Sequence, residues 1–245
     1  MVKKAVISTT LLLLIVFAMN LGYARADLID IGIVNPGFEN PGQTAGVYDP
    51  VTPDGWEIKS KKDRWWYNFD FNAGVWNPGP GDYSGEAPQG DNIGYIEITS
   101  SPGKGIAWFE QTVSGVSMAA GDYWLLVDVG NTLWSSDPED YEGFPGYEIQ
   151  LLAGENLLGN DKNNLLPDEN QFLTSQIKFS FDNDFLGDLT IKLMNLSLAG
   201  GDEVDFDNVR VSDAPLATPE PASMLLLGAG LVGLAGFGRK KMRKK

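Results

Sequence analysis

The 245-residue chain is predicted to contain one all-β domain, an antiparallel β-sandwich of the jelly-roll type, between two short terminal segments. Three observations favour this fold. Short runs rich in β-branched and aromatic residues recur along the body, turn residues separate them, and several runs alternate apolar with polar side chains. No stretch of the body has an apolar stripe at helical spacing. Short antiparallel strands without helices are typical of sandwiches and jelly rolls.

The predicted strands follow one another at short intervals. In Ile177–Phe181 and Leu189–Leu193 apolar side chains occupy every other position, so each run would bury one face. Gaps rich in Gly, Pro and Asp predict ordered loops at 39–54, 76–91 and 133–144. The nine predicted strands are Leu28–Val34, Trp65–Phe71, Asn92–Thr99, Ile106–Val113, Asp122–Gly130, Tyr147–Ala153, Phe172–Phe181, Leu189–Ser197 and Val204–Val211.

The N-terminus has the three parts of a secretory signal peptide. Lys3 and Lys4 form a basic region, residues 5–19 are apolar, and residues 24–26 supply small side chains at a cleavage site. We therefore expect residues 1–26 to be removed. An uncleaved membrane anchor is the alternative, although the apolar run is short for a span of about 20 residues.

The C-terminus combines an acidic motif, an apolar segment and a basic cluster. Pro219, Glu220 and Pro221 precede the uncharged residues 222–238, which are just long enough to cross a membrane, and six Lys and Arg residues follow. Cations after a span remain on the cytoplasmic side. A single-pass tail anchor is one interpretation of this segment.

The order of these three parts resembles the PEP-CTERM sorting signal of Gram-negative bacteria. The resemblance covers residues 217–245 and implies recognition by an exosortase, transient insertion of the transmembrane segment 222–238 in the inner membrane, and delivery to the cell surface or extracellular matrix. The predicted organisation is a signal peptide at 1–26, a β-sandwich domain at 27–213, a linker at 214–218 and the sorting signal at 219–245.

The composition excludes several classes of function. The chain has a net charge of -15, and its body from 27 to 218 has nine cations and 32 acidic residues, a charge of -23. Such a surface repels nucleic acid, so no nucleic-acid partner is expected. There is no Cys or His, which removes thiol nucleophiles, the usual base near neutral pH and the common transition-metal ligands. An oxygen-ligated Ca²⁺ site and a carboxylate-pair glycosidase remain possible.

Four short motifs in the body resemble the galactose-binding-like jelly rolls, which include many carbohydrate-binding modules. The resemblance implies a jelly roll and, where the family binds one, a structural calcium ion. Carried over residue by residue, it places Glu39 and Asp207 as calcium ligands. Alternatively, Glu39 caps a turn and Asp207 hydrogen-bonds the preceding loop without metal. The four motifs are Val34–Glu39, Pro53–Trp56, Glu110–Val113 with Gly121–Tyr123, and Val204–Val211.

Aromatic residues in or beside the long loops are the candidate sugar platform. Neighbouring side chains on a strand face opposite ways, so one of two adjacent tryptophans should be exposed. A large aromatic residue is more often part of the packing, and Trp56, Trp108 and Trp124 are assigned to the core. The candidate ligand-binding residues are Trp65, Trp66, Trp76, Tyr83, Trp134 and Tyr141.

These observations favour a non-catalytic, exported cell-surface or matrix protein that binds polysaccharide. A secreted glycoside hydrolase or lyase with paired carboxylates is one alternative, but the sequence isolates no such pair among its many acids. A purely structural surface protein is the other.

Overall fold

The computed structural model describes residues 27–83, 86–100, 102–132, 144–198 and 203–216. These residues form twelve strands, and every pairing between the strands is antiparallel. Among them there is no helix that could span a membrane. The predicted all-β antiparallel sandwich is therefore confirmed, and its compact unit runs from Asp27 to Pro215.

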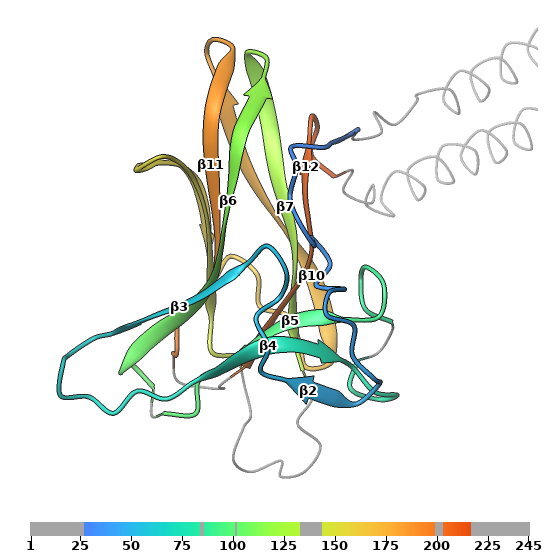
Figure 1. Cartoon of the computed structure of the whole chain (residues 1–245), viewed down its shortest axis with the longest axis vertical. Helices are drawn as coiled ribbons and strands as arrows, with labels where there is room; N and C mark the ends of the chain where they lie inside the picture. The colour runs from blue at the N-terminus through green and yellow to red at the C-terminus, as the bar shows by residue number, and fades with distance from the viewer. Residues whose placement is uncertain (1–26, 84–85, 101, 133–143, 199–202, 217–245) are drawn as a thin grey trace, which may run out of the picture. The chain divides into compact units, whose positions relative to one another are not determined.

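The strands form two sheets (Figure 1). The seven-stranded sheet contains, in spatial order, β10 (Gln171–Phe181), β7 (Gly121–Asn131), β12 (Glu203–Ser212), β5 (Ile93–Glu97), β4 (Asn72–Asn77) and β2 (Val47–Asp49), and β1 (Leu28–Ile29) pairs with β12. The five-stranded sheet contains β3 (Glu57–Lys62), β6 (Gly105–Met118), β11 (Phe185–Asn195), β8 (Tyr147–Ala153) and β9 (Asn156–Lys162).

The main core lies between the two sheets and follows from alternation along the long strands. In β12, Val204 and Phe206 are fully buried in this core, so the acidic residue between them, Asp205, points to the opposite face of the seven-stranded sheet. Phe109 of β6 and Ile191 of β11 complete the core from the five-stranded sheet. Burial of such side chains drives folding at about 25 cal/mol per Å² of apolar surface.

Two of the predicted strands are largely wrong in place or extent, and the ends of two others differ: β5 is shorter than the predicted Asn92–Thr99, and β11 runs from Phe185 to Asn195 where Leu189–Ser197 was predicted. Residues 65–71 form no strand: β3 ends at Lys62, the chain turns with the Tyr67 N–H donating to the Arg64 carbonyl at 3.0 Å, and β4 follows. Their aromatic composition favours a strand locally, but no neighbouring strand pairs with them. At the start, β1 is limited to Leu28–Ile29 because Gly32 adopts φ +87° in a turn closed by Asp30.

Four strands were not predicted, β2, β3, β4 and β9. All four have few large apolar residues, and β3 and β9 are edge strands of the five-stranded sheet. By contrast, β8 has the predicted bounds Tyr147–Ala153, and the long strands β6, β7, β10 and β12 each contain their predicted range. Hydrophobic patterning therefore identifies the long strands that bury one face. It misses the exposed edge strands β3 and β9, and it also misses the short strand β4, although β4 is buried.

Candidate functional site

A second apolar cluster lies on the outer face of the seven-stranded sheet, away from the main core. Trp76 of β4 with Ile93 and Tyr95 of β5 alternate with residues of the main core and therefore point outward. Tyr83 comes from the loop between β4 and β5 and folds onto the same face, where its ring lies 4.4 Å from that of Phe172. We call these five residues the outer aromatic cluster.

Glycine allows the Tyr83 ring to approach the sheet closely. A Cβ atom on Gly130 of β7 would lie 2.5 Å from the Phe172 ring and 2.7 Å from the Tyr83 hydroxyl. Any larger residue at this position would displace one of the two rings. Because Gly130 has no side chain, the β4–β5 loop can pack directly against β7. Tyr83 of this loop then covers the strand beside β7.

That neighbouring strand is β12, and it carries a buried acid beneath Tyr83. Asp205 is fully buried, and the Tyr83 hydroxyl donates a hydrogen bond to its Oδ2, while its Oδ1 has no hydrogen-bond partner. Burial raises the pKa of Asp205 to about 8, against the opposing effect of the Tyr83 hydrogen bond. Asp205 is therefore largely protonated at neutral pH, which is unusual for a carboxyl group and typical of functional sites.

An open cavity of about 370 Å³ lies beside this cluster, lined by Tyr48, Pro50, Asn72, Tyr95 and Glu97. Tyr48 is 37% exposed, and its ring stacks on Trp76 at 4.3 Å. The Asn72 side chain donates to Glu97 at 2.8 Å. The cavity thus combines an aromatic floor with an amide and one carboxylate, whereas Asp205 is not part of its lining.

Glu39 and Asp207, the predicted calcium ligands, hold the same loop before β5. Glu39 accepts hydrogen bonds from the backbone N–H groups of Asp91 and Asn92, and Asp207 accepts one from Gln89 at 2.7 Å. Burial, with smaller contributions from the negative charges of Asp128 and Glu39, raises the pKa of Asp207 to about 8. The two carboxyl groups are therefore close enough to repel each other.

The fit of this pair to calcium is partial. A divalent cation would relieve the repulsion between the two carboxylates, and loop carbonyls could complete an oxygen shell. However, each of the four carboxyl oxygens already accepts a hydrogen bond from an N–H group. The described residues include no group of three or more acidic side chains placed to hold a metal. The calcium site remains a prediction.

The structure separates the predicted aromatic residues into two groups. Trp65 and Trp66 are 87% and 56% exposed on the loop after β3, whereas Trp76 and Tyr83 are buried in the outer aromatic cluster. Trp134 and Tyr141 lie outside the described residues, as do the sorting residues Pro219, Glu220 and Pro221.

Of the three tryptophans assigned to the core, only Trp56 is in it. Trp108 and Trp124 are half-buried on the outer faces of the sheets, where Lys192 and Lys178 lie over their rings. The long stems of lysine cover apolar surface in this way.

Sequence reasoning missed Asp205, Tyr48 and Tyr95. The signal for Asp205 was present in Val204–Asp207, because acids that alternate with core residues must share the outer face of one strand. The signal for Tyr48 was absent, since β2 is a three-residue strand within a loop-like sequence.

Comparison with known proteins finds a matching family for the sandwich domain and another for the C-terminal segment. Residues 217–241 match the PEP-CTERM protein-sorting motif, which confirms that resemblance. The motif indicates export through a sorting system, with membrane anchoring before processing by an exosortase. Residues 29–212 match the HpiC1 cyclase family model. The search of curated proteins finds no match.

The solved structures agree with the second match. The Stig cyclase Fisc from Fischerella sp. TAU, in complex with (3Z)-3-(1-methyl-2-pyrrolidinylidene)-3H-indole, is 36% identical with a TM-score of 0.62, and the match covers 79% of this chain and 100% of that one. A cyclase from Fischerella sp. TAU in complex with 4-(1H-indol-3-yl)butan-2-one is 36% identical with a TM-score of 0.64, over 78% and 100% of the two chains.

An apo cyclase from Fischerella sp. is 34% identical with a TM-score of 0.64, over 80% of this chain and 100% of that one. The family model spans three quarters of the chain, and the matched cyclases align over their full length. This chain therefore belongs to the HpiC1-like cyclase family, and its sandwich is followed by a PEP-CTERM sorting motif.

Proposed function

We propose that this is an exported, non-catalytic protein of the cell surface or extracellular matrix that binds neutral sugar residues of a polysaccharide in the cavity beside Tyr48. The observation that carries the proposal is the lining of that cavity. The half-exposed Tyr48 ring offers an apolar face, and Asn72 and Glu97 offer hydrogen-bonding groups beside it. Sugar rings present C–H faces and hydroxyl groups, which these two kinds of side chain complement.

The arrangement of carboxyl groups supports binding over hydrolysis. Glycosidases use two carboxyl groups on either side of the scissile bond, about 5–10 Å apart. Among the described residues, Glu97 is the one carboxylate in the lining of the cavity, and Asp205 is sealed beneath Tyr83. The acidic rim would also repel anionic sugars, so the expected ligand is neutral.

A glycan array with neutral oligosaccharides tests this proposal. We expect the wild-type protein to retain neutral glycans and Tyr48→Ala to lose them, whereas Trp124→Ala, which removes a half-buried tryptophan elsewhere on the seven-stranded sheet, keeps them. Equal binding by the Tyr48→Ala and wild-type proteins would show that the cavity is not the site.

Acid-assisted cyclisation of a small aromatic substrate is the second candidate, and family membership with one specific observation supports it. Asp205 has a pKa of about 8 and can act as a proton donor at neutral pH. A substrate would reach it only if Tyr83 moved aside, because the Tyr83 ring covers the carboxyl group.

Incubation with indole substrates and chromatography of the products tests the second candidate. Product formation by the wild-type protein that disappears in Asp205→Asn would establish cyclase activity and would refute the non-catalytic proposal. Absence of product, together with neutral-glycan binding that depends on Tyr48, supports the first candidate.

A further inference from the structure

The cations of the body are not spread evenly over its surface. Of the nine, five lie at one edge of the sandwich, on β3, in the loop that follows it and in the adjacent turn before β6. They are Lys59, Lys61, Lys62, Arg64 and Lys104. Figure 1 shows this loop projecting from the sandwich beyond β3. We call these residues together with Trp65 and Trp66 the β3 edge.

Ion pairing distinguishes these cations from the rest. The four cations elsewhere in the body, Lys162, Lys178, Lys192 and Arg210, each contact a carboxylate within 3.3 Å. At the β3 edge only Lys59 does so, with Glu57 and Glu110. The other four form no ion pair with any described residue.

Protection of a free strand edge explains only part of this arrangement. Lysines on an edge strand discourage pairing with another chain, and β3 is an edge of the five-stranded sheet. That reason does not apply to Arg64 or Lys104, which lie outside β3. It also conflicts with Trp65, because an 87% exposed tryptophan favours association with a partner.

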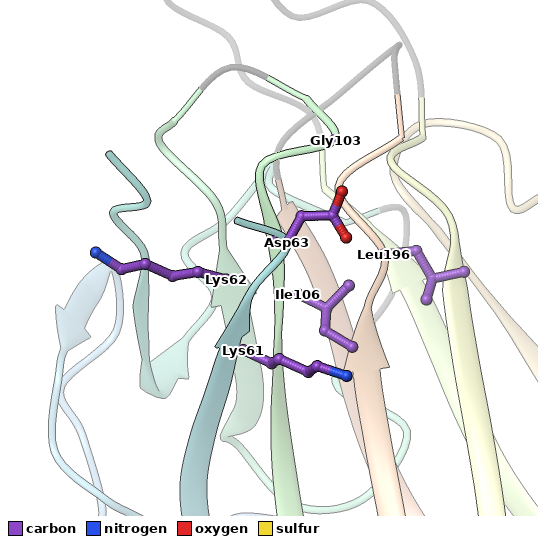
Figure 2. A pocket seen from close by; sticks show the side chains of 7 residues that line it. Lys61, Lys62, Asp63, Gly103, Ile106 and Leu196 are labelled. Carbon is purple, nitrogen blue, oxygen red and sulfur yellow. The ribbon is translucent and has the colours of Figure 1, made fainter. Parts of the chain in front are cut away.

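A hollow in the surface lies beside β3, next to these cations. It has a volume of about 240 Å³, and its lining includes Lys61, Lys62, Asp63 and Ile106. Figure 2 shows Lys61 extending beside Ile106 and Lys62 extending to the other side of the strand, so a chain crossing this edge meets a cation on either side. Asp63 can accept hydrogen bonds from hydroxyl groups there.

An aromatic platform lies within reach of this hollow. Trp65 follows Lys62 by three residues, which limits the separation of their Cα atoms to about 11 Å. Trp65 is the more exposed of the two tryptophans, and Arg64 lies 5.3 Å from the Trp66 ring centroid, so the larger free ring surface belongs to Trp65. The β3 edge thus combines four cations that pair with no described carboxylate and an exposed aromatic ring close to them along the chain.

We propose that the β3 edge binds an acidic polysaccharide, with the sugar carboxylates at Lys61 and Lys62 and a sugar ring on Trp65. This surface lies on the other sheet from the cavity beside Tyr48 and is independent of it. Screening favours a thin chain over a membrane as the ligand. At physiological salt the Debye length is about 8 Å, so a single strand meets only the local cations, whereas an anionic membrane would also face the surrounding acidic surface.

Binding to polygalacturonate, measured by biolayer interferometry with dextran as the neutral reference, tests the proposal. The full-length chain is used in neutral detergent. Lys61→Gln/Lys62→Gln is compared with Lys162→Gln/Lys178→Gln, which removes the same charge from cations that are already paired. Since all variants keep the basic C-terminal residues, any contribution of that tail cancels in the comparison.

We expect Lys61→Gln/Lys62→Gln to weaken polygalacturonate binding by about tenfold or more at low salt and to reduce its salt dependence. The paired-lysine control should match the wild type. Trp65→Ala should weaken binding several-fold without changing the salt dependence, because it removes no charge.

Three results would overturn the proposal. They are equal weakening by the two double variants, no effect of Trp65→Ala, and tighter binding to phosphatidylglycerol vesicles than to polygalacturonate. Neutral-glycan binding through Tyr48 is measured separately on the same variants, so failure at one surface is distinguishable from failure at the other.

Discussion

Replacement of Asp205 by Asn should make the protein more stable at neutral pH and less sensitive to pH. Asp205 is fully buried, and its pKa of about 8 lies far above the 3.8 of an exposed aspartate. Between these two pH values the folded state keeps the proton and the unfolded state releases it. The free energy of unfolding therefore falls as pH rises, by about 1.4 kcal/mol per pH unit for one such acid.

The magnitude follows from the environment of the two carboxyl oxygens. At pH 7 the cost of keeping Asp205 protonated is about 4 kcal/mol at most. Asn keeps the oxygen that accepts from Tyr83 and places an amide nitrogen where Asp205 Oδ1 has no partner. An unsatisfied buried donor costs about 1–3 kcal/mol. The variant should thus gain about 1–3 kcal/mol at pH 7 and nothing at pH 5.

Urea denaturation followed by tryptophan fluorescence at pH 5, 6, 7 and 8 measures this effect. The wild type should lose stability steadily over this range, and Asp205→Asn should lose it at about half the rate, since Asp207 also has a raised pKa. Asp122→Asn, at an exposed carboxylate, is the control. An Asp205→Asn protein with the wild-type slope would refute the assignment of the buried proton to Asp205.

Three further perturbations test other parts of the structure. Ca²⁺ should raise the melting temperature of the wild type but not of Asp207→Ala, and a wild type without any shift in excess Ca²⁺ would contradict the calcium prediction. Gly130→Ala should lower the free energy of unfolding, measured by urea denaturation, by about 1–3 kcal/mol because its Cβ meets two rings. In the control Gly42→Ala, the nearest atom to the new Cβ is 3.6 Å away, so the free energy of unfolding should change by less than about 0.5 kcal/mol. Equal losses in the two variants would count against close packing at Gly130. Tyr147→Phe should lower the free energy of unfolding by about 1–3 kcal/mol in the same assay, because it removes the hydroxyl group that donates a hydrogen bond to the buried Asp161. An unchanged midpoint would mean that water replaces the hydroxyl.

The sequence was sufficient for the sandwich because its long strands bury one face. Alternation in β10 and β11 appears directly as the pattern of buried and exposed side chains. The candidate site was less predictable, since it depends on contacts between distant segments. Tyr83 reaches Asp205 across 122 residues, and the raised pKa of Asp205 comes from burial that no local pattern reports.

The motifs recognised in the sequence also did not identify the cyclase family or the residues that line the cavity, because those residues are far apart along the chain. Glu39 and Asp207 were recognised because they follow short local patterns, and they do meet at one loop. The residues that line the cavity come from β2, β4 and β5 and share no spacing along the chain. A site assembled by sheet pairing becomes visible only when the register of the strands is known.

The two proposed surfaces differ in their electrostatics, which makes their ligands separable in one experiment. The cavity beside Tyr48 has Glu97 at its rim and the buried Glu203 nearby, so an anionic chain is repelled there. The β3 edge has four cations without an ion pair to any residue that the structure describes, so attraction to an anionic chain depends on low ionic strength. Raising salt from 50 to 500 mM should therefore release polygalacturonate and leave neutral-glycan binding unchanged. If both ligands dissociated together, a single shared surface would bind them, and the assignment of separate sites to the two sheets would fail.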